Sequence, residues 1–249
     1  MNSSTIEQLL KQRGAWLKKV RGDEAEALQR ATLSRTIADD YMRFENLRDM
    51  IGNLALATTR EEYDVIYERP EMARLLTHME QSGLIREEQF GGVGVETKAR
   101  RYLSGGWLEE LVWLAAREAG ADEAVFGQVV GWEVKGFTGE NEIDLLMRKG
   151  ARLAFVSCKA LRSELDINDK KHRNRLMDAV HEADNLADHF GRQGEKVAVV
   201  VTTDLYDEMK NAPRYQALLG KAAVLDVRVI ALEELVWDKL VEAMRELLV

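Results

Sequence analysis

Two stretches of the sequence carry residue types that can together hydrolyse a phosphodiester bond. The first is NEIDLL, which holds Asp144, and the second is RLAFVSCKA, which ends in Ser157, Cys158, Lys159 and an alanine. Side chains two apart on a strand point the same way, so Ser157 and Lys159 are expected to share a face while Cys158 faces the other. A neighbouring antiparallel strand that begins near Asp144 brings its carboxylate beside that face. We therefore expect Asp144 to lie near Lys159.

The chemistry of this arrangement needs a further acid. Phosphodiester hydrolysis uses one or two divalent cations held by oxygen ligands, together with a cationic group that stabilises developing charge. Glu109, in the helix-like stretch GGWLEELV, is the favoured second acid, and Glu110 and Glu142 are less favoured. The prediction is a catalytic site in which Glu109 and Asp144 are metal ligands and Lys159 is the orienting or charge-stabilising group.

These residues resemble a known family. A helix with a glutamate, a strand with an aspartate and a strand ending in acid-x-lysine are the pattern of the PD-(D/E)xK, or restriction-endonuclease-like, nuclease superfamily. The order GGWLEELV, NEIDLL and SCKA, then EADNLADHFG and VAVVVTT, is similar to the nuclease domain of CRISPR-associated effectors activated by cyclic oligoadenylate, over roughly residues 84–249. The resemblance implies a homodimer that cleaves single-stranded DNA or RNA, and nicks duplex DNA, with Mn²⁺ or Mg²⁺.

Two features depart from the family pattern. Ser157 stands where the pattern has an acid, so the ligands that the resemblance implies for the metal are Glu109, Asp144, the backbone carbonyl of Cys158 and water. The mainly helical residues 1–104 are also too few for a complete Rossmann-like sensor domain. Either the chain is a free-standing relative, with a cyclic-oligoadenylate sensor or other regulator on another chain, or it is a truncation.

Ser157 keeps a second hypothesis open, a catalytically silent nuclease-fold protein that binds nucleic acid or a protein partner. A third hypothesis is a transcription-factor-like protein whose N-terminal region binds duplex DNA sequence-specifically. A basic cluster follows the motif and is interpreted either as a grip on a phosphate backbone or as a solvated helix start. Its members are Lys170, Lys171, Arg173 and Arg175.

Bulk properties narrow the class of protein. The net charge of -8 argues against non-specific coating of nucleic acid, which depends on neutralising phosphates. Cys158 is the single cysteine, so internal disulfides and multi-cysteine zinc sites are excluded. The sequence shows neither an apolar run long enough to span a membrane nor a secretory signal, and we expect a cytoplasmic protein without membrane contact.

The elements that must position the site follow from periodicity. Residues 105–249 alternate strands and helices, which predicts an α/β fold with a mixed sheet flanked by helices. The resemblance implies that this sheet is restriction-endonuclease-like. Residues 1–104 are predicted as a mainly helical, winged-helix-like region: two helices in the first sixty residues, a third from Pro70, and a short ribbon. A hairpin turn is predicted at Thr138-Gly139, and a helix around Tyr206 to Leu219.

Other side chains near the motif have ordinary structural explanations. Stacking on bases is the functional interpretation of Trp107 and Trp132, and core packing is the favoured one. Cys158 is expected in the core, because no activating histidine accompanies it. The histidines of the helix after the motif are spaced too widely for a helix-based zinc site and are predicted at the surface. They are His172, His181 and His189.

Overall fold

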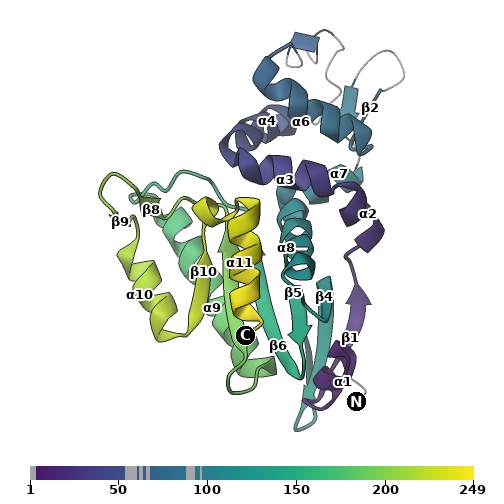
Figure 1. The fold of residues 1–249 in the computed structure, drawn as a ribbon, viewed down its shortest axis with the longest axis vertical. Helices are drawn as coiled ribbons and strands as arrows, with labels where there is room; N and C mark the ends of the chain where they lie inside the picture. The colour runs from purple at the N-terminus through teal and green to yellow at the C-terminus, as the bar shows by residue number, and fades with distance from the viewer. Residues whose placement is uncertain (1–3, 54–60, 62–63, 66–67, 88–92, 96) are drawn as a thin grey trace.

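A six-stranded sheet, with the helical region above it in Figure 1, forms the framework of the fold. The computed structural model describes residues 4–53, 61, 64–65, 68–87, 93–95 and 97–249. In order across the sheet the strands are β1 (Ala15–Val20), β4 (Glu123–Val134), β5 (Phe137–Lys149), β6 (Arg152–Lys159), β7 (Lys196–Val201) and β10 (Val227–Ile230). The first four run antiparallel to one another, whereas β7 and β10 run parallel to β6. The predicted α/β fold with a mixed sheet is confirmed.

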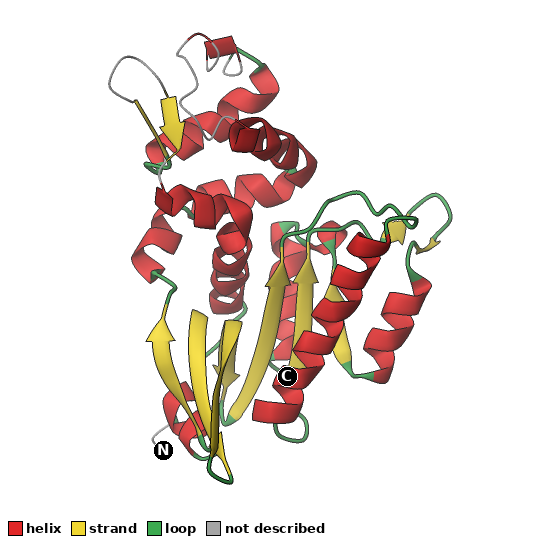
Figure 2. Ribbon diagram, turned by 180° about the vertical axis from the view of Figure 1, so that it is seen from behind, coloured by secondary structure: helices red, strands yellow, loops and turns green. Residues whose placement is uncertain are grey.

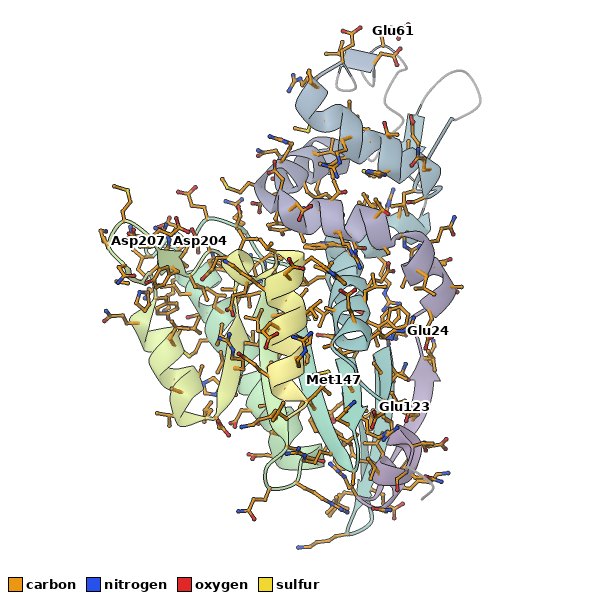
Figure 3. The ribbon with its side chains drawn as sticks, in the orientation of Figure 1. Glu24, Glu61, Glu123, Met147, Asp204 and Asp207 are labelled. Atoms are coloured by element: carbon orange, nitrogen blue, oxygen red, sulfur yellow. The ribbon has the colours of Figure 1, made fainter. Side chains whose placement is uncertain are left out.

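Helices cover both faces of the sheet. α8 (Trp107–Glu118) and α11 (Trp237–Leu247) pack on one face, and α1 (Ile6–Lys11), α9 (Lys170–Phe190) and α10 (Gln216–Val224) cover the other. The apolar stripe of α9 is buried there, because residues three and four apart lie on one side of a helix. Met147 of β5, labelled in Figure 3, is fully buried on the side of α8 and α11.

The helical region lies beyond the N-terminal end of α8 (Figures 1 and 2). It contains α2 (Glu24–Gln29), α3 (Ala31–Asp39), α4 (Tyr41–Asn53), α6 (Pro70–Gln81), a ribbon of β2 (Ile85–Glu87) and β3 (Val93–Val95), and α7 (Thr97–Arg101). The predicted helix from Pro70 is confirmed, with Pro70 in its first turn and Gly83, at φ 67°, just beyond its end. Among the described residues no helix is long and apolar enough to cross a membrane.

The first residues of the chain correct the two-helix prediction. β1 pairs antiparallel with β4, from Ala15 opposite Trp132 to Val20 opposite Gln128. A short isolated helix is marginal in water, whereas pairing with β4 gives this segment a ladder of backbone hydrogen bonds along one side and buries Ala15. A division between residues 104 and 105 therefore separates β1 from the sheet to which it belongs.

Two connections also differ from prediction. The β4–β5 turn is at Lys135-Gly136, with φ 51° and 82°, and not at Thr138-Gly139. Positive φ at both central residues suits a tight hairpin. Gly139 instead lies within β5, opposite Trp132, where a side chain would collide with the indole. The helix predicted around residues 206–219 starts only at Gln216. It follows a small hairpin of β8 (Tyr206–Asp207) and β9 (Ala212–Pro213).

A buried ion pair ties the N-terminal segment to the sheet. Arg13, between α1 and β1, donates from Nη1 and Nη2 to both carboxylate oxygens of Glu195 at 2.6 and 2.7 Å. Both side chains are almost fully buried, and Glu195 also accepts the backbone N–H of Leu153 at the start of β6. Because two parallel hydrogen bonds fix the guanidinium, this pair sets the position of α1 and β1 against the sheet.

Arg13→Ala is expected to lower the free energy of unfolding by about 3–5 kcal/mol, because it leaves the Glu195 carboxylate buried without its cation. Lys11→Ala is the matched control, since the Lys11 pair with Glu7 is exposed and should contribute less than about 1 kcal/mol. Urea unfolding followed by circular dichroism measures both. Equal losses in the two variants would contradict a structural role for Arg13.

Candidate functional site

The site forms where β5 and β6 stop pairing. Their last paired residues are Leu145 and Val156. Beyond them the Asp144 carboxylate takes the place of a backbone acceptor: its Oδ2 accepts the Cys158 N–H at 2.7 Å and the Ser157 hydroxyl at 3.3 Å. The N–H and C=O of one strand residue point to the same edge. The Cys158 carbonyl is therefore directed toward the gap that holds Asp144.

The alternation of side chains in β5 changes at Asp144. Ile143 packs with α1 and α9, whereas Leu145, two residues on, packs with α8 on the opposite face. The register of β4 and β5 places Gly127, at φ 57°, opposite Asp144. A side chain at Gly127 would start 3.4 Å from Glu109 Oε2 and 3.0 Å from the Gly22 nitrogen. The irregularity thus gives two carboxylates a common space at the edge of the sheet.

Glu109 comes from the first turn of α8 and points into this space. Its side chain is 18% exposed and lines a cavity of 350 Å³ together with Cys158 and Lys159. Burial and the charge of Asp144 raise the pKa of Glu109 to about 7, although Arg101 opposes the shift. Burial also raises the pKa of Asp144, despite the hydrogen bond from Cys158. Two buried carboxylates that resist losing both protons form a site for a cation or a shared proton.

Lys159 enters the same cavity and forms its ion pair on the α9 side of it. Its Nζ lies 2.6 Å from Oε2 of Glu182 on α9. Burial disfavours the ammonium, yet the hydrogen bond and charge of Glu182, with a contribution from Asp144, raise the pKa of Lys159. The raised pKa therefore keeps Lys159 protonated. The sequence analysis did not predict Glu182. Its available signal was its place on the helix with the buried stripe, one turn from Asp178, which also lines the cavity.

Arg101 is the second side chain that sequence reasoning missed. It ends α7, and its Nη2 lies 3.6 Å from Glu109 Oε2 while its Nη1 donates to the Arg21 carbonyl at 3.3 Å. The only hint in the sequence is the pair of arginines shortly before GGWLEELV. Glu110 and Glu142 are engaged elsewhere: Glu110 binds Arg30 in a buried pair and Glu142 binds Arg21 at 2.6 Å. The acid that reaches Asp144 from α8 is thus Glu109.

Ser157 and Cys158 occupy opposite environments. Ser157 is buried, and its hydroxyl is hydrogen-bonded to Asp144. Cys158 packs against the cluster of α8, and burial followed by the nearby carboxylates raises the pKa of its thiol well above the ordinary value. The thiol remains protonated and is unsuited to nucleophilic attack.

The structure separates the predicted basic cluster. Arg175 lines the 350 Å³ cavity beside Glu182, whereas Lys170, Lys171 and Arg173 do not. Lys170 and Lys171 are exposed at the start of α9, where Asp169 caps the helix. Arg175 is thus the member of the cluster that shares a cavity with Glu109.

The predicted positions of the aromatic and histidine side chains are mostly found. Trp107 is fully buried, with its ring 5.4 Å from that of Tyr41. Trp132 is half-buried and donates to Asn141. His181 and His189 are exposed, but the surface prediction is wrong for His172. That ring is buried with Nε2 3.1 Å from Thr203 Oγ1, because its position on α9 faces the end of β7.

The oxygen atoms at this site fit a hard divalent cation. In the part of the chain that the structure describes, no group of three or more His, Cys, Asp or Glu side chains is arranged to hold a metal. The Glu109 and Asp144 carboxylates with the Cys158 carbonyl instead make a set of two side chains and one backbone oxygen. Mg²⁺ commonly takes one or two carboxylates and keeps several waters, so this set is sufficient for it.

Comparisons with known proteins point to one family. The family model described as "Card1-like, endonuclease domain" matches residues 96–235. Protein VC1899 from Vibrio cholerae is similar in structure with a TM-score of 0.68 at 17% identity, over 99% of this chain and 62% of that one. Can2 from Sulfobacillus thermosulfidooxidans, in complex with cyclic tetra-adenylate, gives 0.58 at 15% identity, over 97% and 61%. The chain spans about three-fifths of the length of either structure, and no curated protein matches it.

Glu109 is expected to titrate near pH 7 in the metal-free protein, and Asp144→Asn is expected to lower the pKa of Glu109 because the neighbouring charge is gone. Arg101→Gln should raise it. NMR titration of the glutamate carboxyl carbons, assigned with Glu109→Gln, measures these shifts. A wild-type Glu109 pKa near 4.5 would contradict the buried carboxylate pair.

Proposed function

The chain belongs to the Card1-like endonuclease domain family, and we propose on this premise that it is a divalent-metal-dependent nuclease of the PD-(D/E)xK type. The observation that carries the proposal is the cavity that Glu109 shares with Cys158 and Lys159, beside the buried Asp144 carboxylate, which accepts the Cys158 N–H and acts electrostatically on Glu109. Burial disfavours ionisation of both carboxyl groups, and a bound cation offsets this cost. The adjacent ammonium is placed to bind an anionic substrate.

The proposed roles follow from what each group touches. Glu109, Asp144 and the Cys158 carbonyl hold Mn²⁺ or Mg²⁺, which supplies polarisation of the phosphate and activation of water when bound. Asp144 is oriented for this by the Cys158 N–H and by the Ser157 hydroxyl, both on its Oδ2. Asp144 Oδ1 accepts no hydrogen bond from the described residues and is left for the cation.

Lys159 is proposed as the group that binds the scissile phosphate and stabilises the charge that develops on it. Its raised pKa keeps the ammonium charged at neutral pH. Glu182 is a positioning residue, since it holds Nζ at 2.6 Å on the α9 side of the cavity. Arg175, on the same helix, is placed to contact a flanking phosphate.

The biological setting is proposed from the same family membership. The fold likeness to Can2, whose structure contains cyclic tetra-adenylate, supports a nuclease of CRISPR-associated defence. For this chain we propose a homodimer and a cyclic-oligoadenylate sensor, or another regulator, supplied in trans. Single-stranded DNA or RNA is the proposed substrate, with nicking of duplex DNA as a further activity.

Asp144→Asn and Glu109→Gln are expected to lower cleavage of labelled single-stranded DNA and RNA by at least about 10²-fold, since each removes a ligand of the cation. Both should also abolish the Mn²⁺-dependent rise in Tm, which in wild type should grow as pH rises through about 7 because Glu109 must lose its proton to bind a cation.

Lys159→Ala is expected to lose cleavage but to keep the Mn²⁺-dependent rise in Tm, because the Lys159 side chain is not a proposed ligand of the cation. Glu246→Gln is the control, as an exposed carboxylate on α11. Assays run with Mn²⁺, Mg²⁺ or chelator, with and without cyclic oligoadenylates. Equal cleavage by wild type and Asp144→Asn would contradict the site assignment.

Ser157 supports a second candidate function, a silent nuclease-fold protein that binds nucleic acid or a protein partner. The residue is buried and uncharged, so the site has two carboxylates rather than three. A silent protein should show neither Mn²⁺-dependent cleavage nor a saturable rise in Tm. Gain of cleavage in Ser157→Glu, absent from wild type, would favour this candidate.

A further inference from the structure

An exposed face of the sheet leads directly to Asp144. Trp16 of β1 pairs with Gly131 of β4, which pairs with Glu140 of β5, so the three form one row across the strands. Successive side chains alternate between the two faces of a strand. Since Trp132 and Asn141 belong to the opposite, α9-facing side, the row of Trp16 lies on the other face.

Two further rows continue from this one toward the site. Lys19, Val129 and Glu142 pair across the same strands in the next row. Arg21 then donates its N–H to the Gly127 carbonyl, and the register places Gly127 opposite Asp144. The distance along β5 from the row of Trp16 to Asp144 is about 13 Å, at about 3.3 Å per residue. The face and the carboxylate pair are therefore neighbours.

Trp16 lies flat and open on this face. The residue is 37% exposed, and a Cβ on Gly131 would come within 2.7 to 2.9 Å of three indole atoms. Gly131 thus lets the ring rest on the strand beside it. Trp107 and Trp113 are, by contrast, fully buried. A ring held against a sheet with its outer side in solvent is a surface on which a flat group can stack.

The same strand supplies cations. Lys18 pairs with Glu140 at 3.0 Å and Arg21 with Glu142 at 2.6 Å, and all four side chains are about half exposed. Lys19 is exposed and has no recorded ion pair in the described residues. Exposed ion pairs contribute little and are screened by salt, so a phosphate can replace the carboxylate partner.

Three adjoining cavities lead, one after another, from β1 to the site. A groove of 480 Å³ is lined by Lys18, Lys19, Arg21 and Glu142. Arg21 also lines a cavity of 280 Å³ that contains Arg101 and Glu109, and Glu109 in turn lines the 350 Å³ cavity of Lys159. The three cavities are adjacent because Arg21 lines the first and second and Glu109 lines the second and third. Cationic side chains therefore follow the path from β1, past the carboxylate pair, to α9.

We propose that the β1 face binds single-stranded nucleic acid on one side of the scissile bond, with Trp16 stacked on a base and Lys18, Lys19 and Arg21 on phosphates. The inference rests on the proposed function, because it takes the Glu109 and Asp144 pair as the cleavage point. An aromatic ring near a groove that contains three cationic side chains suits a single strand, whose bases are free to stack outward. In a duplex the bases are paired and stacked internally, so Trp16 has no base face to contact.

The test measures binding of the full chain, carrying Asp144→Asn to prevent cleavage, to fluorescent single-stranded oligonucleotides by anisotropy. Trp16→Ala is expected to weaken binding about tenfold, while Trp16→Phe keeps most of it because a stacking ring remains. Lys18→Gln with Lys19→Gln should reduce the slope of log affinity against log salt by about 1.4, for two lost phosphate contacts. Lys210→Gln with Lys239→Gln, on β8–β9 and α11, is the control and should change neither quantity.

The result that overturns the inference is equal binding by Trp16→Ala, the double lysine variant and the control, or no binding by any form. Duplex DNA that competes as well as the single strand, with the same losses in the variants, also overturns it. Its failure is distinguishable from failure of the proposed function. Wild-type cleavage with unchanged KM in the β1 variants rejects only the binding face, whereas variant-sensitive binding without wild-type cleavage rejects only the nuclease.

Discussion

The hydrogen bond from the Cys158 N–H to the Asp144 carboxylate is the contact on which the site depends. Two antiparallel strands that separate expose backbone groups, which must find other partners when buried. Here a side chain from one strand satisfies the backbone of the other at 2.7 Å. That single contact fixes the carboxylate in the gap, points the Cys158 carbonyl toward it, and leaves room for Glu109 to enter from α8.

Charge is separated around this gap in a consistent way. Burial raises the pKa of both Glu109 and Asp144, and the charge of Asp144 raises that of Glu109 further, while the cations lie at the edges: Arg101 beside Glu109, and Lys159 paired with Glu182. A central deficit of positive charge with cations at the edges suits a metal ion at the centre and phosphates around it. The whole-chain charge of -8 does not oppose this, because binding depends on local fields.

The parts of this arrangement that were predictable are those encoded locally. Asp144 and Lys159 sit in strands whose apolar runs mark them, and Glu109 sits in a helix with an apolar stripe. Glu182 and Arg101 were missed because only tertiary packing brings α9 and α7 to the strand ends. The face to which the Asp144 side chain points was also not predictable from the sequence. The alternation of side chains along β5 changes at Asp144, opposite Gly127, which has a positive φ.

The strand β1 was missed for a related reason, since its composition resembles that of the helices after it and its partner lies more than a hundred residues away in sequence. Pairing with β4 decided its conformation, as strand propensity depends on context. The same dependence explains the β4–β5 turn, where Lys135 takes a left-handed conformation that its residue type alone does not favour.

The helical region supports the site from both sides of the gap. Tyr41 of α4 stacks on Trp107, two residues before Glu109, and its hydroxyl donates to the Leu161 carbonyl at 2.8 Å, two residues after Lys159. Glu45, one turn along α4, accepts the hydroxyl and the N–H of Ser163. One helix thus contacts both the start of α8 and the segment that follows β6. The spacing of Glu109 from Lys159 is therefore set by α4 as well as by the sheet, which links the helical region to the geometry of the carboxylate pair.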